Sequence, residues 1–349
     1  MSIQTVNEVT GRYQISKGVT RNDLQKLASN SKTQSIQFAS SLEDKEIELL
    51  EKEVFSKRHD ITLRIYAHYS EKCDLSFIER IPSLRKLSAD CLMEASNIET
   101  VIKLKNLDSL GVGIFNLDNF DFLEKINPNI KGLSLHETRS TKIKIECISR
   151  FTNLEHLYLE RHQNGIESIS HLKNLQTIVL RSVSTKNIDF LTKLEHLWSV
   201  DIKLGGIKNF DALTTLPKIK YLELWQVRGL GDLSFISSLP TLQNVFLQSL
   251  KQVQVLPHLD KNKSLRRIYI ENLKGLKDLT ALRTAPNLRE LICALASNQE
   301  PENLIPALEN PIIKNVLCGF GSDKKNNRFD ELRRQYKKEE YKHSEFKYE

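Results

Sequence analysis

The sequence predicts an α/β solenoid, in which short strands and their return segments repeat along the chain and stack side by side. A strand-like pattern, apolar-x-x-apolar-x-apolar, recurs at a nearly constant period. Between its copies, apolar residues recur every third position, which suits a tight helical turn or an extended return leg. The 349 residues are 40% apolar and contain 9 prolines, a composition typical of a folded chain. A repeat array of this length needs no central globular core, because each repeat packs on its neighbours.

Residues 219–239 contain one complete copy of the pattern. Leu222 and Leu224 alternate with polar and aromatic residues, which predicts a short strand with one buried face. From Leu230 to Leu239, apolar residues recur three apart. The strand and its return segment cannot bury their apolar side alone, so copies must be stacked on both sides of them.

The period extends over most of the chain. The central apolar residue of each predicted strand is followed by the next after 21 to 25 residues. These residues are Leu63, Leu87, Leu110, Leu133, Leu157, Ile178, Val200, Leu222, Val245, Ile268, Leu291 and Val316. Intervals in so narrow a range exclude a chance pattern, so we expect about twelve parallel strands spaced ~4.8 Å apart.

This arrangement resembles leucine-rich repeats, and in particular the internalin-like bacterial subtype with repeats of about 22 residues. The copies LEHLYL (154–159), IKYLEL (219–224) and LRRIYI (265–270) match the strand motif, and LGDLSFISSLPTL (230–242) matches the return segment. The resemblance covers roughly residues 60 to 320. It implies a horseshoe with a parallel β-sheet on its concave face and short helical or extended return legs on its convex face.

Two departures from the family pattern limit what the resemblance implies. The position after the strand, which holds asparagine in many such families, holds Leu92, Phe115, Thr138, His162, Val183, Gly205, Val227, Leu250, Leu273 and Ala296. A ladder of asparagine hydrogen bonds is therefore absent, and the loop carbonyls and amides must find other partners. The N-terminus has no apolar run of signal-peptide length, and no stretch approaches ~18 consecutive apolar residues. We therefore predict a cytoplasmic protein without a membrane segment, and the extracellular, host-binding role of secreted relatives is not carried over.

Residues 1–60 are assigned to an N-terminal tail and a capping strand and helix. Residues 1–34 are polar and show no clear period, which fits a loose tail or an irregular first layer. A helix is predicted after Ser41 as N-cap, with Ile47 and Leu50 near one face. Such a cap would cover the exposed core of the first repeat.

Residues 61–320 form the predicted array, and residues 321–349 are assigned to a charged C-terminal capping helix or tail. Phe329, Leu332 and Tyr336 fall three and seven residues apart, so one helix face could lie over the last repeat. From residue 322 onward the chain has 9 Lys and Arg against 7 Asp and Glu, which is typical of a solvated helix face.

The strand side chains that point away from the core are not chosen by packing, and they line the predicted concave face. Along this face the residues change from small and polar, through mixed charge, to aromatic and apolar. Tryptophan, tyrosine and arginine dominate interface energetics, and exposed aromatic clusters indicate a partner. We predict a partner-binding site that comprises Tyr158, Arg181, Asp201, Lys203, Tyr221, Glu223, Trp225, Phe246, Arg267 and Tyr269. Farther along the face, Ile292 and Leu317 could instead be ordinary core covered by the C-terminal tail.

The sequence contains no catalytic or metal-binding constellation, so we predict no enzyme activity, no cofactor and no metal. The Gly-x-Gly pairs at 111–113 and 229–231 lack the helix-opening glycine of a phosphate loop. His136 and Glu160 occupy equivalent positions in adjacent repeats, where a surface hydrogen bond is expected rather than acid–base chemistry. The five cysteines are scattered and form no CxxC pair, which argues against zinc and disulfide frameworks. Cys293 and Cys318 fall at the same inward position of neighbouring repeats and are expected in the core.

Together these features predict a monomeric protein-interaction scaffold that binds a protein partner on its concave face. Lys and Arg exceed Asp and Glu by 51 to 44, a net charge of +7. This mild excess permits nucleic-acid binding but does not require it, and the concave residues include about as many acids as bases, so nucleic acid is not expected as a partner. A more specific alternative is an immunity- or inhibitor-type protein that neutralises a toxin or enzyme.

Overall fold

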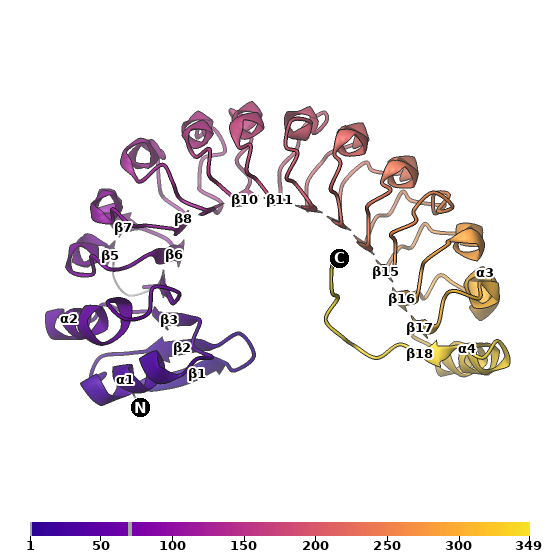
Figure 1. The fold of residues 1–349 in the computed structure, drawn as a ribbon, viewed down its shortest axis with the longest axis horizontal. Helices are drawn as coiled ribbons and strands as arrows, with labels where there is room; N and C mark the ends of the chain where they lie inside the picture. The colour runs from indigo at the N-terminus through magenta and orange to yellow at the C-terminus, as the bar shows by residue number, and fades with distance from the viewer. Residues whose placement is uncertain (1, 69–71) are drawn as a thin grey trace. The chain divides into compact units, whose positions relative to one another are not determined.

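The computed structural model describes residues 2–68 and 72–349. The chain divides into two compact units, Met1–Lys173 (unit 1) and Asn174–Glu349 (unit 2). In each unit, parallel strands alternate with short turns, and the turns lie on the opposite side of the repeats from the exposed strand face (Figure 1). This is the leucine-rich repeat solenoid that the period predicted.

Unit 1 contains a sheet in the order β1-β2-β3-β4-β6-β8-β9-β10 and a small parallel pair, β5 and β7. All neighbours in the larger sheet are parallel except β1 and β2, which are antiparallel. The strands are β1 (Ile3–Asn7), β2 (Arg12–Ile15), β3 (Ser35–Phe38), β4 (Thr62–Ala67), β5 (Cys73–Asp74), β6 (Lys86–Leu92), β7 (Ala95–Ser96), β8 (Ser109–Ile114), β9 (Gly132–Leu135) and β10 (His156–Glu160). The helices are α1 (Arg21–Ser29) and α2 (Asp44–Leu50), with a π-helical turn at Glu51–Phe55 and 3-10 turns at Ser76–Arg80, Ile98–Lys103, Asp121–Lys125, Glu146–Arg150 and Ile166–His171.

The first layer of unit 1 is more regular than the sequence indicated. The polar residues before position 34 form the β1–β2 hairpin and helix α1, whose N-cap Thr20 exchanges hydrogen bonds with Asp23. The prediction of Ser41 as the cap of α2 was wrong, because the N-cap is Glu43. The carboxylate of Glu46, in the first turn, accepts the Glu43 N–H at 2.8 Å, which is one half of a capping box.

Unit 2 continues the same plan, with strands in the order β11-β12-β13-β14-β15-β16-β17-β18. The strands are β11 (Thr177–Arg181), β12 (Ser199–Lys203), β13 (Tyr221–Trp225), β14 (Asn244–Gln248), β15 (Arg267–Glu271), β16 (Glu290–Ala294), β17 (Asn315–Cys318) and β18 (Glu339–Glu340). The 3-10 turns are Asp189–Leu191, Asp211–Thr215, Ser234–Ser238, Thr280–Thr284 and Pro301–Leu304, and the helices are α3 (Ile305–Glu309) and α4 (Asp323–Gln335). Both predicted forms of return leg occur, because the segment between β14 and β15 has no helical turn among the described residues.

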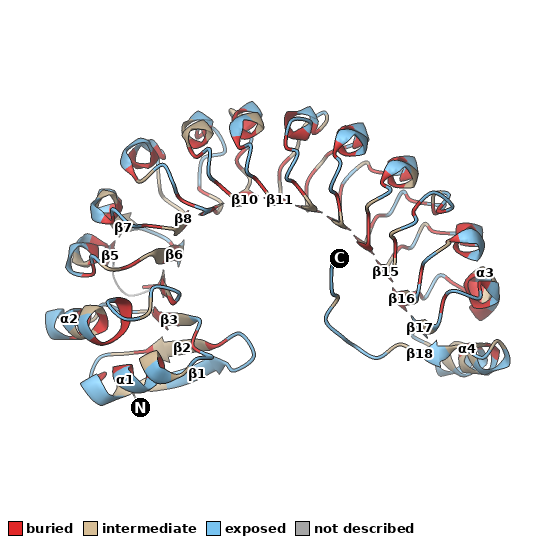
Figure 2. Cartoon of the chain, viewed as in Figure 1, coloured by how far each residue is buried: buried red, intermediate tan, exposed pale blue. Residues whose placement is uncertain are grey.

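The register confirms the period. In unit 2, Leu222 pairs with Val200 on one side and with Val245 on the other, and the same holds along the row. These residues and the apolar return-segment residues are buried between strands and turns (Figure 2). Full burial of one leucine or isoleucine contributes roughly 1.5–3 kcal/mol, so the repeats supply the core of each unit. Cys293 and Cys318 pair in register and are both buried, as expected.

Most repeats end their strand at a residue with positive φ that is not glycine. Examples are Ser182, Leu204, Gln226, Ser249, Asn272 and Leu295, with φ between 49° and 58°. This left-handed conformation turns the chain out of the sheet at the same place in successive repeats, at a modest steric cost for a side chain with a Cβ.

Buried asparagine side chains satisfy carbonyls at the ends of the 3-10 turns. The amide of Asn262, fully buried, donates to the carbonyls of Ile236 and Leu239 at 2.8 and 3.0 Å. Asn310 makes the equivalent pair of bonds about two repeats farther along the chain, to the carbonyls of residues 282 and 285. Each such bond pair caps the end of a 3-10 turn, where carbonyls would otherwise be buried without donors.

Helix α4 packs on the last repeat, with Phe329 and Leu332 buried. Phe329 packs against Phe320, with ring centroids 5.6 Å apart. After the helix, Lys338 donates to the carbonyls of Asn310 and Ile313 at 2.6 and 2.8 Å, and β18 then adds to the sheet beside β17.

Candidate partner-binding face

The parallel register of unit 2 arranges its outward side chains in three rows. The central row consists of Asp201, Glu223, Phe246 and Tyr269, which pair in order. The amino row lies two residues earlier in each strand and includes Tyr221, Asn244, Arg267 and Glu290. The carboxyl row lies two residues later and includes Arg181, Lys203 and Trp225. Nine of the ten predicted site residues therefore lie on one face of one unit.

A lysine holds two acids together at the start of this face. The Nζ atom of Lys203 lies 2.8 Å from Asp201 Oδ2 and 3.1 Å from Glu223 Oε1. The hydroxyl of Tyr221 donates to Glu223 Oε2 at 2.6 Å. Lys203 Nζ also lies 5.7 Å from the ring centroid of Trp225, and the guanidinium carbon of Arg181 lies 5.9 Å from it. Lys203 is thus held by one acid of its own strand and by one acid of the adjacent strand.

Burial shapes the protonation of this cluster. The pKa of Asp201 is raised from 3.8 to about 6, chiefly by burial and further by the nearby Glu223, against the opposing effect of Lys203. Burial lowers the pKa of Lys203, but its two carboxylate partners outweigh burial and the pKa is raised overall. Burial, and then the hydrogen bond to Glu223, raises the pKa of Tyr221. At neutral pH the lysine and tyrosine keep their protons, while Asp201 holds its negative charge against the cost of desolvation.

Aromatic side chains follow the charged cluster. Phe246 and Tyr269 pack with ring centroids 4.8 Å apart and an interplanar angle of 55°. Within the described chain, the buried indole Nε1 of Trp225 and the buried Oδ1 of Asp201 have no hydrogen-bond partner. Unpaired buried polar atoms cost folding free energy.

The end of the chain covers the amino row. After β18, the segment from Tyr341 to Glu349, here named the tail, runs back along the inner side of unit 2 (Figure 1). Tyr348 packs against Trp198 and Tyr221, with ring centroids 5.2 and 6.3 Å apart. Two of the predicted site residues, Tyr221 and Arg267, therefore contact the tail.

The alternative prediction was that the C-terminal tail covers Ile292 and Leu317 and makes both of them core. Its outcome differs between the two residues. Ile292 is buried, whereas Leu317 is 38% exposed. The tail does run back over the strand face, but its hydrogen bonds go to residues at the start of the strands. Three residues in these contacts, Trp198, Gln243 and Arg266, were not predicted. They lie just before their strands, where the alternation of the strand motif assigns no face.

Tyr158, the tenth predicted site residue, lies in unit 1. Its ring lies 4.8 Å from that of His136, and its hydroxyl donates to Glu160 Oε2 at 3.2 Å. His136 Nδ1 lies 3.5 Å from the same Glu160 oxygen, so the predicted contact between adjacent repeats forms. His162, from the loop that follows, turns inward instead and is fully buried, with Nε2 2.9 Å from the carbonyl oxygen of His136.

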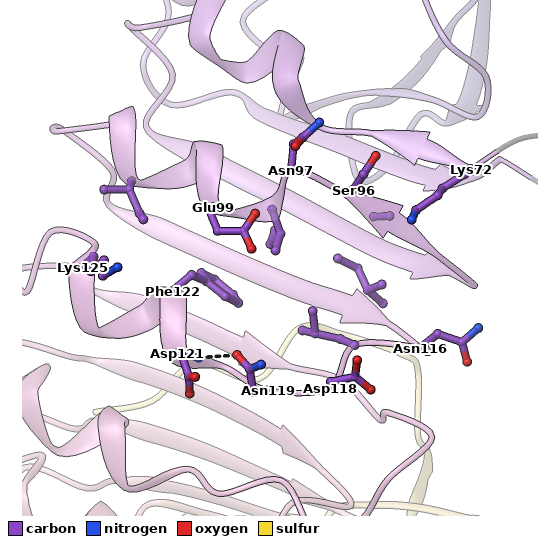
Figure 3. A pocket seen from close by; sticks show the side chains of 15 residues that line it. Lys72, Ser96, Asn97, Glu99, Asn116, Asp118, Asn119, Asp121, Phe122 and Lys125 are labelled. Atoms are coloured by element: carbon purple, nitrogen blue, oxygen red, sulfur yellow. Dashed lines mark hydrogen bonds between the residues drawn. The ribbon is translucent and has the colours of Figure 1, made fainter.

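Unit 1 also has a depression of about 580 Å³ on the side of its 3-10 turns. Figure 3 shows its polar side chains spread along the depression, with Lys72 and Asn116 toward one end and Lys125 at the other. The hydrogen bond within it joins the Asp121 N–H to Asn119 Oδ1 and stabilises a turn. These groups do not converge on one point as a catalytic site requires. Across residues 2–68 and 72–349, no three His, Cys, Asp or Glu side chains could hold a metal ion together.

Comparison with solved structures identifies the fold. The internalin InlF from Listeria monocytogenes aligns with a TM-score of 0.57 and 17% identity, over 89% of this chain and 87% of that one. A leucine-rich repeat protein from Leptospira interrogans aligns with a TM-score of 0.44 and 16% identity, over 92% of both chains. No family model and no curated protein sequence matches the chain. The protein has the leucine-rich repeat fold, of the kind found in internalins.

None of the helices in the described part of the chain is both long enough and apolar enough to cross a membrane. The leucine-rich repeat fold is a scaffold that commonly serves protein interaction, through the surface that the stacked strands present.

Proposed function

We propose that the protein is a protein-interaction scaffold and that the strand face of unit 2 binds a protein partner. The observation that carries this proposal is the central row, in which two aromatic rings follow two acids held by one lysine. Aromatic anchors next to charges that are already fixed are typical of the energetic centre of an interface. Because Lys203, Asp201 and Glu223 hold one another before binding, less side-chain entropy is lost when a partner docks.

The partner is expected to present complementary features in the same order. A basic or hydrogen-bond-donating group would face Asp201 and Glu223, since the trio with Lys203 carries a net charge of −1 once both acids are ionised. An apolar group would pack against Phe246 and Tyr269.

An inhibitor- or immunity-type role is the more specific form of this proposal. A rigid face with fixed charges and aromatic anchors can cover the active site of an enzyme as well as any other surface. The two forms differ in outcome, because an inhibitor abolishes the activity of the captured partner at equimolar concentration, whereas an adaptor leaves it unchanged.

The test is affinity capture from the native cell with the full chain as bait, followed by quantitative mass spectrometry. The double variant F246A/Y269A removes both aromatic anchors, and V255A/L295A removes two exposed apolar side chains elsewhere in the unit. We expect the first variant to lose the partner by at least about tenfold and the control to retain it. Equal capture by F246A/Y269A, with its circular dichroism unchanged, would overturn the proposal.

A further inference from the structure

The tail occupies the strand face as an extended peptide ligand would. From Tyr341 to Glu349 it adds no helix or strand beyond β18 and crosses the starts of successive strands. Nine extended residues span about 30 Å. The five strand intervals from β17 to β12 require about 24 Å, so the tail reaches Trp198 from its own anchor. Lys338, whose pKa burial lowers, fixes that anchor through its bonds to Asn310 and Ile313.

One glutamine recognises the tail backbone without regard to sequence. The side-chain amide of Gln243 donates to the carbonyl oxygen of Glu349 at 2.9 Å and accepts the Glu349 N–H at 3.0 Å. A pair of bonds to both backbone groups of one residue is how a neighbouring strand would hold an extended segment. Arg266 adds a bond to the carbonyl of Lys347 at 2.7 Å, and Arg267 one to the carbonyl of Ser344 at 3.2 Å.

Two aromatic side chains of the tail give the site its selectivity. The ring of Phe346 lies between two guanidinium groups, with its centroid 4.9 Å from the Arg266 carbon and 5.0 Å from the Arg267 carbon. Tyr348 packs on Trp198, and its hydroxyl accepts a hydrogen bond from Asn244 at 3.2 Å. The two rings are two residues apart, as side chains on one side of an extended segment must be. Glu349 completes the pattern by pairing with Arg266 at 2.6 Å.

The tail lies at the surface of unit 2. None of its residues is buried, and the Glu349 side chain is 77% exposed. An ion pair that is open to solvent on one side contributes little, typically below about 1 kcal/mol. The tail competes chiefly because it is tethered, which gives it an effective concentration in the millimolar range.

We propose that this groove, formed by Trp198, Gln243, Asn244, Arg266 and Arg267, binds an extended segment of a protein partner with the pattern aromatic-x-aromatic-acid. The tail carries the same pattern and is an internal competitor for the groove. This inference rests on the proposed function, since it identifies the class of partner segment that the strand face of unit 2 accepts. It also divides the face into an amino row that holds the segment and a central row that contacts the rest of the partner.

The test uses a fluorescent peptide of residues 341–349 and the full chain. The double variant F346A/Y348A weakens the internal competitor and leaves the groove intact. If the tail fills the groove nine-tenths of the time in the wild type, the peptide should bind the variant ~tenfold more tightly. Adding R266A to the variant should abolish peptide binding, whereas adding R283A, which removes an arginine of a 3-10 turn, should not. A peptide with both aromatics changed to alanine should fail to bind.

Three results would overturn the inference. The first is equal affinity of the peptide for wild type and variant, and the second is peptide binding that persists with R266A. The third is a concentration-dependent dimer of the wild type that F346A/Y348A lacks, since the tail would then occupy the groove of a second copy. Folding of every variant is verified by circular dichroism, because Tyr348 packs on Trp198 and its removal changes tryptophan fluorescence by itself.

The peptide experiment tests the groove inference, and the capture experiment tests the proposed function, so the failure of one can be told from the failure of the other. If F246A/Y269A loses its partner but the peptide binds no variant, the proposed function stands and the groove inference falls. If the peptide binds as expected but partner capture does not depend on Phe246 and Tyr269, the proposed function is wrong. The groove then binds the tail peptide, but no partner segment is assigned to it. When both hold, F346A/Y348A should also capture more partner than the wild type.

Discussion

Replacing Asp201 by asparagine should raise the free energy of unfolding of unit 2 at neutral pH. The gain over the wild type should be smaller in acid. The side chain is only 12% exposed, and its ionised form is disfavoured by burial. Asparagine keeps the shape of the neutral acid, so D201N removes the buried charge without leaving a cavity. Lys203 retains Glu223 as a partner in the variant.

The size of the effect follows from the two pKa values. The pKa of Asp201 is about 6 in the folded protein against a reference of 3.8. The folded state therefore binds more protons than the unfolded state between these values, and stability falls as pH rises from about 4 to 6. The full loss is about 3 kcal/mol, since one pKa unit corresponds to about 1.4 kcal/mol. Between pH 4.5 and 7.5 the change is about 2 kcal/mol.

The assay is urea unfolding followed by tryptophan fluorescence, which reports on unit 2 because both tryptophans lie there. The free energy of unfolding of D201N minus that of the wild type should increase by about 2 kcal/mol from pH 4.5 to 7.5. Asp278 is a control of opposite character, because the hydroxyl and amide of Thr280 lower its pKa. Its carboxyl is largely ionised in both the folded and the unfolded state above pH 4.5, so D278N should show almost no change over this range. A difference for D201N that is the same at both pH values would refute the reasoning.

Two further predictions concern a buried asparagine of unit 2 and the thiols of the chain. Changing Asn262 to alanine should lower the free energy of unfolding by about 2–3 kcal/mol, because two buried carbonyls lose their donor. Urea unfolding measures this loss. A loss below about 0.5 kcal/mol, the size expected for the exposed Asn153→Ala, would contradict the capping role of Asn262. At pH 8, iodoacetamide should modify the exposed Cys91 first, slowly because burial raises the pKa of its thiol, and should reach the buried Cys293 and Cys318 only after urea is added. Peptide mapping gives the order, and early labelling of Cys318 would show that the last repeats open readily.

The period was enough to predict the array because each repeat must bury the same few positions. Leu222 and its equivalents fix the register of every strand, since a slip by one residue would expose the whole apolar set. The left-handed residues that end the strands could not be predicted in this way. Leu204 and Gln226 have no preference for positive φ, so their conformation is imposed by the repeats on either side.

The site was predictable to the extent that strand alternation determines it. Asp201, Glu223 and Phe246 were placed on one face because they alternate with buried residues, and their row follows from the same register. The groove residues Gln243 and Arg266 precede their strands, where alternation has no meaning. The tail could have been suspected from Phe346 and Tyr348, two aromatics in an otherwise charged stretch. Only the fold brings Tyr348 to residues that precede it by about 100 and about 150 positions in the chain.

The central claim is that the strand face of unit 2 contacts the partner, and photo-crosslinking tests it most directly. A photoreactive phenylalanine analogue is placed at position 246 on the central row, or at the exposed position 255 on a return leg. After illumination in the native cell, we predict one specific crosslinked species from position 246 and none from position 255. Crosslinks to the same species from position 255, with none from position 246, would contradict the account.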